Sequence, residues 1–179
     1  MLLWTIQHRS SYDEMMLRGS LRANEDHLFC ENDFREQYDW IAQQLTIRVS
    51  PPPQGIKYPV WAWYKCEGKR KRPDMRSHAW HWCNRKGTPI VLLTVDIPDN
   101  LVLLSDFDRW NIVLNGQYLS KDEDDDAESN VDACVIRKSW KRIFDLSPSE
   151  YWGRCDTVQA IMWEIKQEWV LKTEFFSSR

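Results

Sequence analysis

The stretch Tyr58-Pro59-Val60-Trp61-Ala62-Trp63-Tyr64-Lys65 decides the fold, because it reads as a β-strand that is apolar on both sides. Successive side chains of a strand point to opposite faces of its sheet. Val60, Ala62 and Tyr64 therefore share one face, and the two tryptophans take the other. The prolines of Ser50-Pro51-Pro52-Pro53 precede this strand and end whatever helix comes before it, because they supply no backbone donors.

Working outward from this strand, other apolar runs predict further strands, and periodic stripes predict helices. A helix begins at the capping box Ser11 to Glu14 and stops at Gly19. The remaining strands are expected at 2–7, 89–96, 101–104 and 169–176, and the remaining helices after Asn32, after Ser105, around 139–144 and after Asp156. The last helix should turn Val158, Ile161, Met162, Ile165 and Trp169 inward. This order favours one α+β domain over 1–179, with a mixed or split antiparallel sheet flanked by helices.

Composition excludes several classes of protein. The 179 residues include 24 Lys and Arg against 27 Asp and Glu, which gives a net charge of −3. This charge excludes a polycationic protein that coats nucleic acid or membrane without specificity. Five cysteines at irregular spacing do not form a disulfide framework. A spanning helix needs about 20 apolar residues, which the chain lacks, and its N-terminus lacks the apolar core of a signal peptide. We expect a cytoplasmic protein without a membrane partner.

The basic, Trp-rich segment 61–86 is the strongest local signal. Cationic side chains neutralise phosphates and indoles stack on bases, so this composition predicts a site for a nucleotide or a single nucleic-acid strand. The residues expected to hold phosphate are Lys69, Arg70, Lys71, Arg72 and Arg76. The alternative, equally weighted, is a solvated loop whose tryptophans belong to the core.

The acidic loop 120–132 is predicted to be a flexible, solvated insertion. Binding of a divalent cation and shielding of the basic segment remain alternatives. No metal is expected elsewhere, because the potential zinc ligands do not have the spacing of a structural zinc site. Those ligands are Cys66, His78, His81 and Cys83.

The sequence Trp163-Glu164 places a carboxylate beside an indole near the end of the chain. Such a carboxylate is typical of enzymes that cleave N-glycosidic bonds, where it positions a ribose hydroxyl or stabilises a developing cation. An exposed helix face is the simpler interpretation of the same residues. With six glycines in all and no glycine-rich phosphate loop, anions must be held by side chains or helix N-termini.

Several motifs together resemble a family of small bacterial proteins catalogued as a domain of unknown function. They include Trp4-Thr5-Ile6-Gln7, Gly19-Ser20-Leu21-Arg22, Tyr58 to Tyr64, Lys69-Arg70-Lys71-Arg72-Pro73-Asp74, Leu103 to Asp108 and Gln159-Ala160. The resemblance covers nearly the whole chain and implies a bacterial or phage source, but no activity.

The opening strand, capped helix and Gly-x-Leu-Arg turn also resemble the first unit of ADP-ribosyltransferase-like domains, in which these elements hold NAD. The run Ile90 to Pro98 is similar to a central strand pair of that split-sheet fold. The resemblance implies that Gln7 and Arg22 bind the cofactor NAD. We expect Trp63 to be a further contact of NAD.

The same resemblance implies catalytic roles for Tyr64, which would stack on nicotinamide, and for a late glutamate, Glu164 or Glu174. Neither the His-Tyr-Glu nor the Arg-Ser-Glu pattern of those domains is intact, which leaves the catalysis open.

Two functional hypotheses follow. In the first, the chain is an NAD-dependent transferase that modifies a nucleic acid or a protein, and its basic segment brings in the acceptor. In the second, it is a non-catalytic nucleic-acid-binding or inhibitor module that uses the basic segment alone. NAD should raise the melting temperature in the first case and not in the second.

Overall fold

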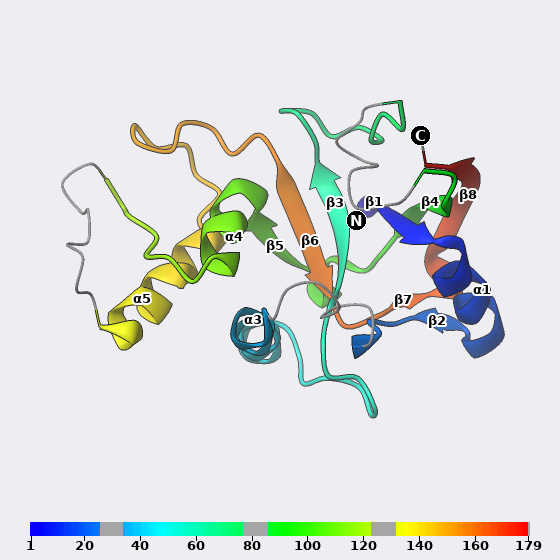
Figure 1. Ribbon diagram of the computed structural model, residues 1–179, viewed down its shortest axis with the longest axis horizontal. Coiled ribbons are helices and arrows are strands. Elements are labelled where there is room, and N and C mark those ends of the chain that lie inside the picture. The colour runs from blue at the N-terminus through cyan, green and yellow to red at the C-terminus, as the bar shows by residue number, and fades with distance from the viewer. Residues whose placement is uncertain (26–33, 77–85, 123–131, 179) are drawn as a thin grey trace.

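A six-stranded antiparallel sheet forms the centre of the molecule in the computed structural model, which describes residues 1–25, 34–76, 86–122 and 132–178 (Figure 1). Its order is β5-β6-β3-β1-β4-β8, and a two-stranded ladder pairs β2 with β7. The strands are β1 (Leu2–His8), β2 (Ser20–Leu21), β3 (Val60–Lys65), β4 (Pro89–Asp96), β5 (Leu103–Asp106), β6 (Val158–Met162), β7 (Ile165–Lys166) and β8 (Val170–Ser177).

Four helices lie among the described residues: α1 (Arg9–Arg18), α3 (Arg35–Arg48), α4 (Phe107–Leu114) and α5 (Ala133–Ser139). Short 3₁₀ turns occupy Asp99–Leu101, Trp140–Phe144 and Gln167–Trp169. The chain thus has the mixed α+β fold with an antiparallel sheet that the sequence predicts.

The sheet divides between β1 and β3. These strands share the single register pair Trp4↔Trp63, whereas β1 pairs with β4 along its whole length, from Leu2↔Asp96 to His8↔Ile90. The Thr5 hydroxyl closes the junction by donating a hydrogen bond to the Trp61 carbonyl at 2.8 Å. Two three-stranded halves, β5-β6-β3 and β1-β4-β8, therefore meet at one narrow contact (Figure 1).

Each face of the sheet carries its own core. On the face of Val60 and Ala62, which we call the α1 face, Met15 of α1 packs together with Leu21 and Ile165 of the β2–β7 ladder. On the opposite face, the α4 face, Trp61 meets apolar residues of α3 and α4. The rings of Trp61 and Trp110 lie 5.0 Å apart, and Tyr38 approaches Trp110 edge-on at 6.0 Å. The alternation predicted for β3 is confirmed.

The helix predicted after Asp156 is wrong. Residues Val158–Met162 form β6, which lies between β5 and β3, and all five side chains are buried. A strand covered on both faces has a continuous apolar sequence, and periodicity alone does not distinguish such a run from a buried helix. Trp169 is likewise part of a 3₁₀ turn rather than of this helix.

Two helix starts also differ from the sequence prediction. α1 begins at Arg9 rather than at Ser11, with His8 before it and no side-chain cap. Ser105 belongs to β5, and Asp106 caps α4 by accepting a hydrogen bond from the Arg109 amide at 3.0 Å. The stop at Gly19 is confirmed, because this residue is left-handed with φ of 80°.

Candidate functional site

Arg22 and Glu164, 142 residues apart in sequence, form an ion pair on the α1 face. The ladder that pairs Ser20 with Lys166 and Leu21 with Ile165 brings them together. Arg22 Nε and Nη2 each lie 3.2 Å from Glu164 Oε2, and Nε also donates to the Ser20 hydroxyl at 3.0 Å. The side chain of Glu164 is only 15% exposed. Two residues that sequence analysis put in one site are therefore in contact.

Gln7 lies at the same end of the sheet. The antiparallel pair Trp4↔Trp63 sets Gln7 near the start of β3, and Val60 there pairs with Met162, two residues before Glu164. Alternation puts Gln7 on the α1 face together with Thr5, and its Nε2 donates to the Thr5 hydroxyl at 2.7 Å. Gln7 is half-buried where β1 and β3 diverge.

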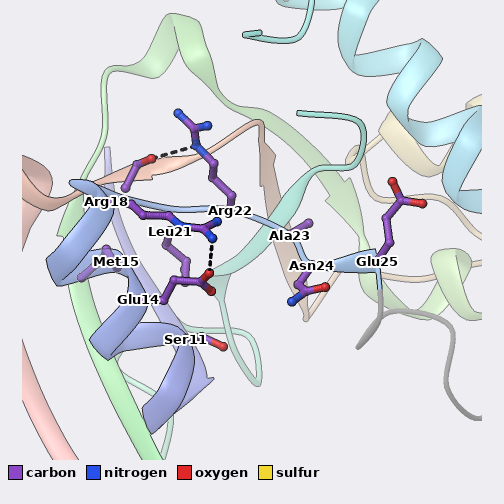
Figure 2. Close-up of a pocket in the computed structure, with 10 residues that line it drawn as sticks. Ser11, Glu14, Met15, Arg18, Leu21, Arg22, Ala23, Asn24 and Glu25 are labelled. Carbon is purple, nitrogen blue, oxygen red and sulfur yellow. Dashed lines mark hydrogen bonds and ion pairs between the residues drawn. The ribbon is translucent and has the colours of Figure 1, made fainter. Parts of the chain in front are cut away.

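A pocket of about 330 Å³ opens between α1 and the segment that follows it. Arg18 and Arg22 line it, as do the hydroxyls of Ser11 and Ser20. In Figure 2 the Arg18 guanidinium meets Glu14, at 2.8 Å, while that of Arg22 turns the other way, toward Ser20. The remaining lining residues are Glu14, Met15, Leu21, Ala23, Asn24 and Glu25. Guanidinium and hydroxyl groups of this kind suit a polar ligand that carries phosphate.

Tyr64 and Trp63 lie away from this pocket. Tyr64 is at the far end of β3, about 13 Å along the strand from Val60. The Arg70 guanidinium lies 4.1 Å from the centre of the Tyr64 ring and donates to the Leu2 carbonyl at 3.2 Å. Trp63 points to the α4 face and packs edge-on against Phe107 at 5.2 Å. The structure therefore does not bring these two aromatic residues to Glu164.

The cations of the basic segment are distributed among carboxylates of the same chain. Arg72 binds Glu174 through two hydrogen bonds of 3.0 and 3.1 Å. Although partial desolvation opposes it, hydrogen bonds from Arg72 and Lys172 hold the pKa of Glu174 below its ordinary value. The other pairs are Lys71 with Glu67 at 2.8 Å and Arg76 with Asp74 at 2.9 Å, and Lys69 is exposed.

Glu174, the other candidate for the late glutamate, lies on β8 and pairs with Arg72. It does not contact Arg22. The carboxyl of Asp74 has a pKa well below its usual range, because Arg76 donates to it from both its side chain and its backbone.

Trp80 and Trp82 lie outside the described residues, as do positions 123–131 of the acidic loop.

Sequence analysis missed the buried polar group at the start of α4. Asp106 and Arg109 are 5% and 4% exposed, and Arg109 Nη1 donates to the carbonyls of Arg142 and Asp145 at 3.0 and 2.5 Å. Among the described residues, the Ser105 hydroxyl and the Gln159 side-chain oxygen are buried without a hydrogen-bond partner. The sequence feature that could have predicted this group is the spacing of Asp106 three residues before Arg109 at the start of a helix.

No cluster of three or more His, Cys, Asp or Glu within the described ranges has the geometry to hold a metal ion. Cys66 is buried, and burial raises its pKa to about 11, while His78, His81 and Cys83 lie outside the described residues. None of the helices in the described part of the chain is long and apolar enough to cross a bilayer.

Residues 2–133 match the profile of a family described as a domain of unknown function (DUF3841). The chain belongs to this family. No curated protein and no solved structure matches it. The DUF3841 match includes Gln7, Arg22 and the pocket, whereas Glu164 and strand β6 lie beyond it. The sequence resemblance to a family of unknown function is thereby confirmed over residues 2–133, whereas the motif Gln159-Ala160 lies beyond the match.

Proposed function

We propose that the chain binds a nucleotide at the α1–β2 pocket and acts on it as an ADP-ribosyltransferase-like domain, with NAD as the ligand to test. One observation carries the proposal: Arg22 lines the pocket and also holds Glu164. A cation suited to phosphate and a carboxylate suited to a ribose hydroxyl are thereby adjacent, although distant parts of the chain supply them.

The donor inventory of the site fits a dinucleotide. A guanidinium has five N–H donors. In Arg22, Nε contacts both Ser20 and Glu164, and Nη2 contacts Glu164. Its remaining donors are suited to a phosphate, and a pyrophosphate that also binds Arg18 would have to displace Glu14, which pairs with Arg18 at 2.8 Å. Both contacts to Glu164 fall on Oε2, so Oε1 is the acceptor for a ribose hydroxyl.

Bound NAD would supply a labile N-glycosidic bond to nicotinamide. The chain's own contribution would be electrostatic: Glu164, held in place by Arg22, would face the positive charge on the ribose as nicotinamide leaves, and a nucleophile of the nucleic-acid or protein acceptor would take the ADP-ribosyl group. Gln7 offers an amide at the same end of the sheet, at the point where β1 and β3 part. The resemblance to ADP-ribosyltransferase-like domains implies binding at this first strand and at the turn after its helix.

The proposed site consists of Gln7, Arg18, Arg22 and Glu164. Tyr64 and Trp63 are left out of it, because the length of β3 separates Tyr64 from Glu164 and Trp63 faces the other side of the sheet. A different aromatic group, or none, would therefore contact the nicotinamide.

The alternative function, nucleic-acid binding through the basic segment, is favoured less. Lys71, Arg72 and Arg76 already face carboxylates, and a phosphate would have to displace Glu67, Glu174 or Asp74. Release of counterions, the main source of affinity for nucleic acids, is small for cations that are paired within the protein.

The test is thermal denaturation with NAD, with ADP-ribose and with a short single strand of DNA. NAD and ADP-ribose should raise the melting temperature of the wild-type chain, because a ligand that binds only the native state stabilises it. Arg22→Ala should lose most of this shift. Arg137→Ala is the matched control, since Arg137 also forms a surface ion pair, with Glu36 at 2.9 Å, on another side of the protein.

Release of nicotinamide separates binding from catalysis. Glu164→Gln should retain a shift with ADP-ribose and lose nicotinamide release, whereas Glu36→Gln should change neither. Absence of any shift with NAD or ADP-ribose would remove the proposal. A salt-sensitive shift with DNA alone would favour the binding module instead.

A further inference from the structure

Among the residues that the structure describes, strand β8 pairs with β4 on one side only, so the other edge of its backbone faces away from the sheet. The opposite edge strand, β5, has four residues, all of them buried or half-buried. β8 has eight residues, and its side chains include Leu171 at 63% exposure and Phe175 at 52%. A long edge with exposed apolar groups is a template for pairing with another chain.

Helix α1 extends this apolar edge. Tyr12 packs edge-on against Phe175 at 5.5 Å, and the Arg9 guanidinium lies 4.2 Å from the centre of the Phe175 ring. Met16 follows Tyr12 by four residues on the same side of the helix and is 44% exposed. Figure 1 shows α1 and β8 at the same end of the molecule, away from α4 and α5. Contiguous exposed apolar groups of this kind mark an interaction surface.

We propose that this edge pairs with β8 of a second copy of the chain, antiparallel and with the two-fold axis at Thr173. The sequence of β8 is self-complementary about that residue. Lys172 then faces Glu174 of the second copy, and Leu171 faces Phe175. Both pairs occur twice because the interface is isologous, so the dimer contains two Lys172–Glu174 pairs and two Leu171–Phe175 pairs.

Lysine in an edge strand ordinarily opposes pairing, because its charge would be placed against an apolar or a cationic neighbour. In this register the charge meets a carboxylate, as it already does within one chain, where Lys172 Nζ lies 3.2 Å from Glu174 Oε1. The lysine therefore selects this partner and this register against others. Lys172–Ser177 pair regularly with β4, and Leu171 is the extra residue between the pairs Thr94↔Lys172 and Val95↔Val170, so the Lys172–Glu174 pair rather than Leu171 sets the register.

The first test is the mass of the chain in solution, measured by light scattering over about a hundredfold range of concentration, because dimerisation follows mass action. We expect twice 21.5 kDa at the upper end. Lys172→Glu should give the monomer mass at every concentration, since it sets two carboxylates against each other in each pair. Ile47→Glu, at a site 73% exposed on α3, is the control and should remain dimeric.

A cysteine at the axis tests the register. In a background with Cys30→Ser, Cys83→Ser and Cys134→Ser, which leaves only the buried thiols of Cys66 and Cys155, Thr173→Cys should form an intermolecular disulfide under mild oxidation. Cross-strand Cα separations of about 4.5 to 5.5 Å permit that bond. Leu171→Cys, which faces Phe175, should crosslink far less. A monomer mass throughout, a dimer that survives Lys172→Glu, or equal crosslinking of the two cysteines would each overturn the proposal.

Discussion

Replacing Asp106 with Asn should destabilise the fold through the charge it removes, and not through the helix cap. Asp106 caps α4, and its Oδ2 lies 3.5 Å from Arg109 Nε, without a hydrogen bond between these two atoms. Asn is as good a capping residue as Asp, so the cap survives the change. The Arg109 guanidinium, however, loses the carboxylate beside it while remaining buried.

The expected magnitude follows from burial and distance. With an effective dielectric constant near 20, two unit charges at this separation interact by roughly 5 kcal/mol. Breaking a buried pair by removing one partner costs about 3–5 kcal/mol. Carbonyls of Arg142 and Asp145 still accept from Arg109 and reduce the loss. We therefore expect Asp106→Asn to lower the free energy of unfolding by about 3 kcal/mol, a large part of ordinary domain stability.

The assay is urea denaturation followed by circular dichroism, arranged as a double-mutant cycle with Arg109→Met. In the Arg109→Met background the Asp106→Asn change should cost less than about 1 kcal/mol, because no buried cation is left without a partner. Asp13→Asn is the matched control: it removes the carboxylate of an exposed i,i+4 pair with Arg9, worth about 0.3–0.5 kcal/mol. Equal costs in the two backgrounds would refute the reasoning.

Three further predictions concern the buried thiols and the end of α1. Burial raises the pKa of Cys66 to about 11 and, with a hydrogen bond to Asp106, that of Cys155 to about 12. Iodoacetamide at pH 8 should therefore label Cys134 well before either, as peptide mass mapping will measure. Because ionisation of these buried thiols is disfavoured only in the folded state, the free energy of unfolding should be unaffected below about pH 9 and fall as pH rises through 11 to 12. Gly19→Ala should cost about 1 kcal/mol in urea denaturation, since φ of 80° disfavours any Cβ although the surrounding space is open. A neutral effect would show that the helix end re-forms.

The parts of the fold that were predictable depend on local pattern. Strands β1, β3 and β4 each alternate or run apolar between turn residues, and the structure has these strands and β8 within a residue or two of their predicted bounds. In the helix predicted after Asn32, Phe34, Tyr38, Ile41 and Leu45 recur at intervals of four, three and four residues, which predicts one buried stripe; Ile41 and Leu45 are buried, while Phe34 and Tyr38 are half-buried. Side-chain spacing along one element suffices to predict which side turns inward.

The site was less predictable because its parts meet through non-local pairing. Glu164 was the expected carboxylate, but sequence analysis set it on a helix that is in fact strand β6 followed by the short strand β7. Only the two-residue ladder between β2 and β7 brings it to Arg22, and a ladder that short has no periodicity to recognise. The ion pair of Arg72 was unpredictable for a related reason, since its partner Glu174 follows it by 102 residues.

Strand β6 links the fold to the proposed site. It lies outside the family match, yet it fills the sheet between β5 and β3, and Ile161 on it is completely buried against the core of the α4 face. Without it, β3 and β5 would present unpaired inner edges, and Glu164 would have no strand to hold it at the end of the sheet. The same strand that completes the core therefore positions the carboxylate, so substitutions in β6 that loosen packing at Ile161 should also weaken the nucleotide binding that we propose at Arg22, seen as a smaller thermal shift with ADP-ribose.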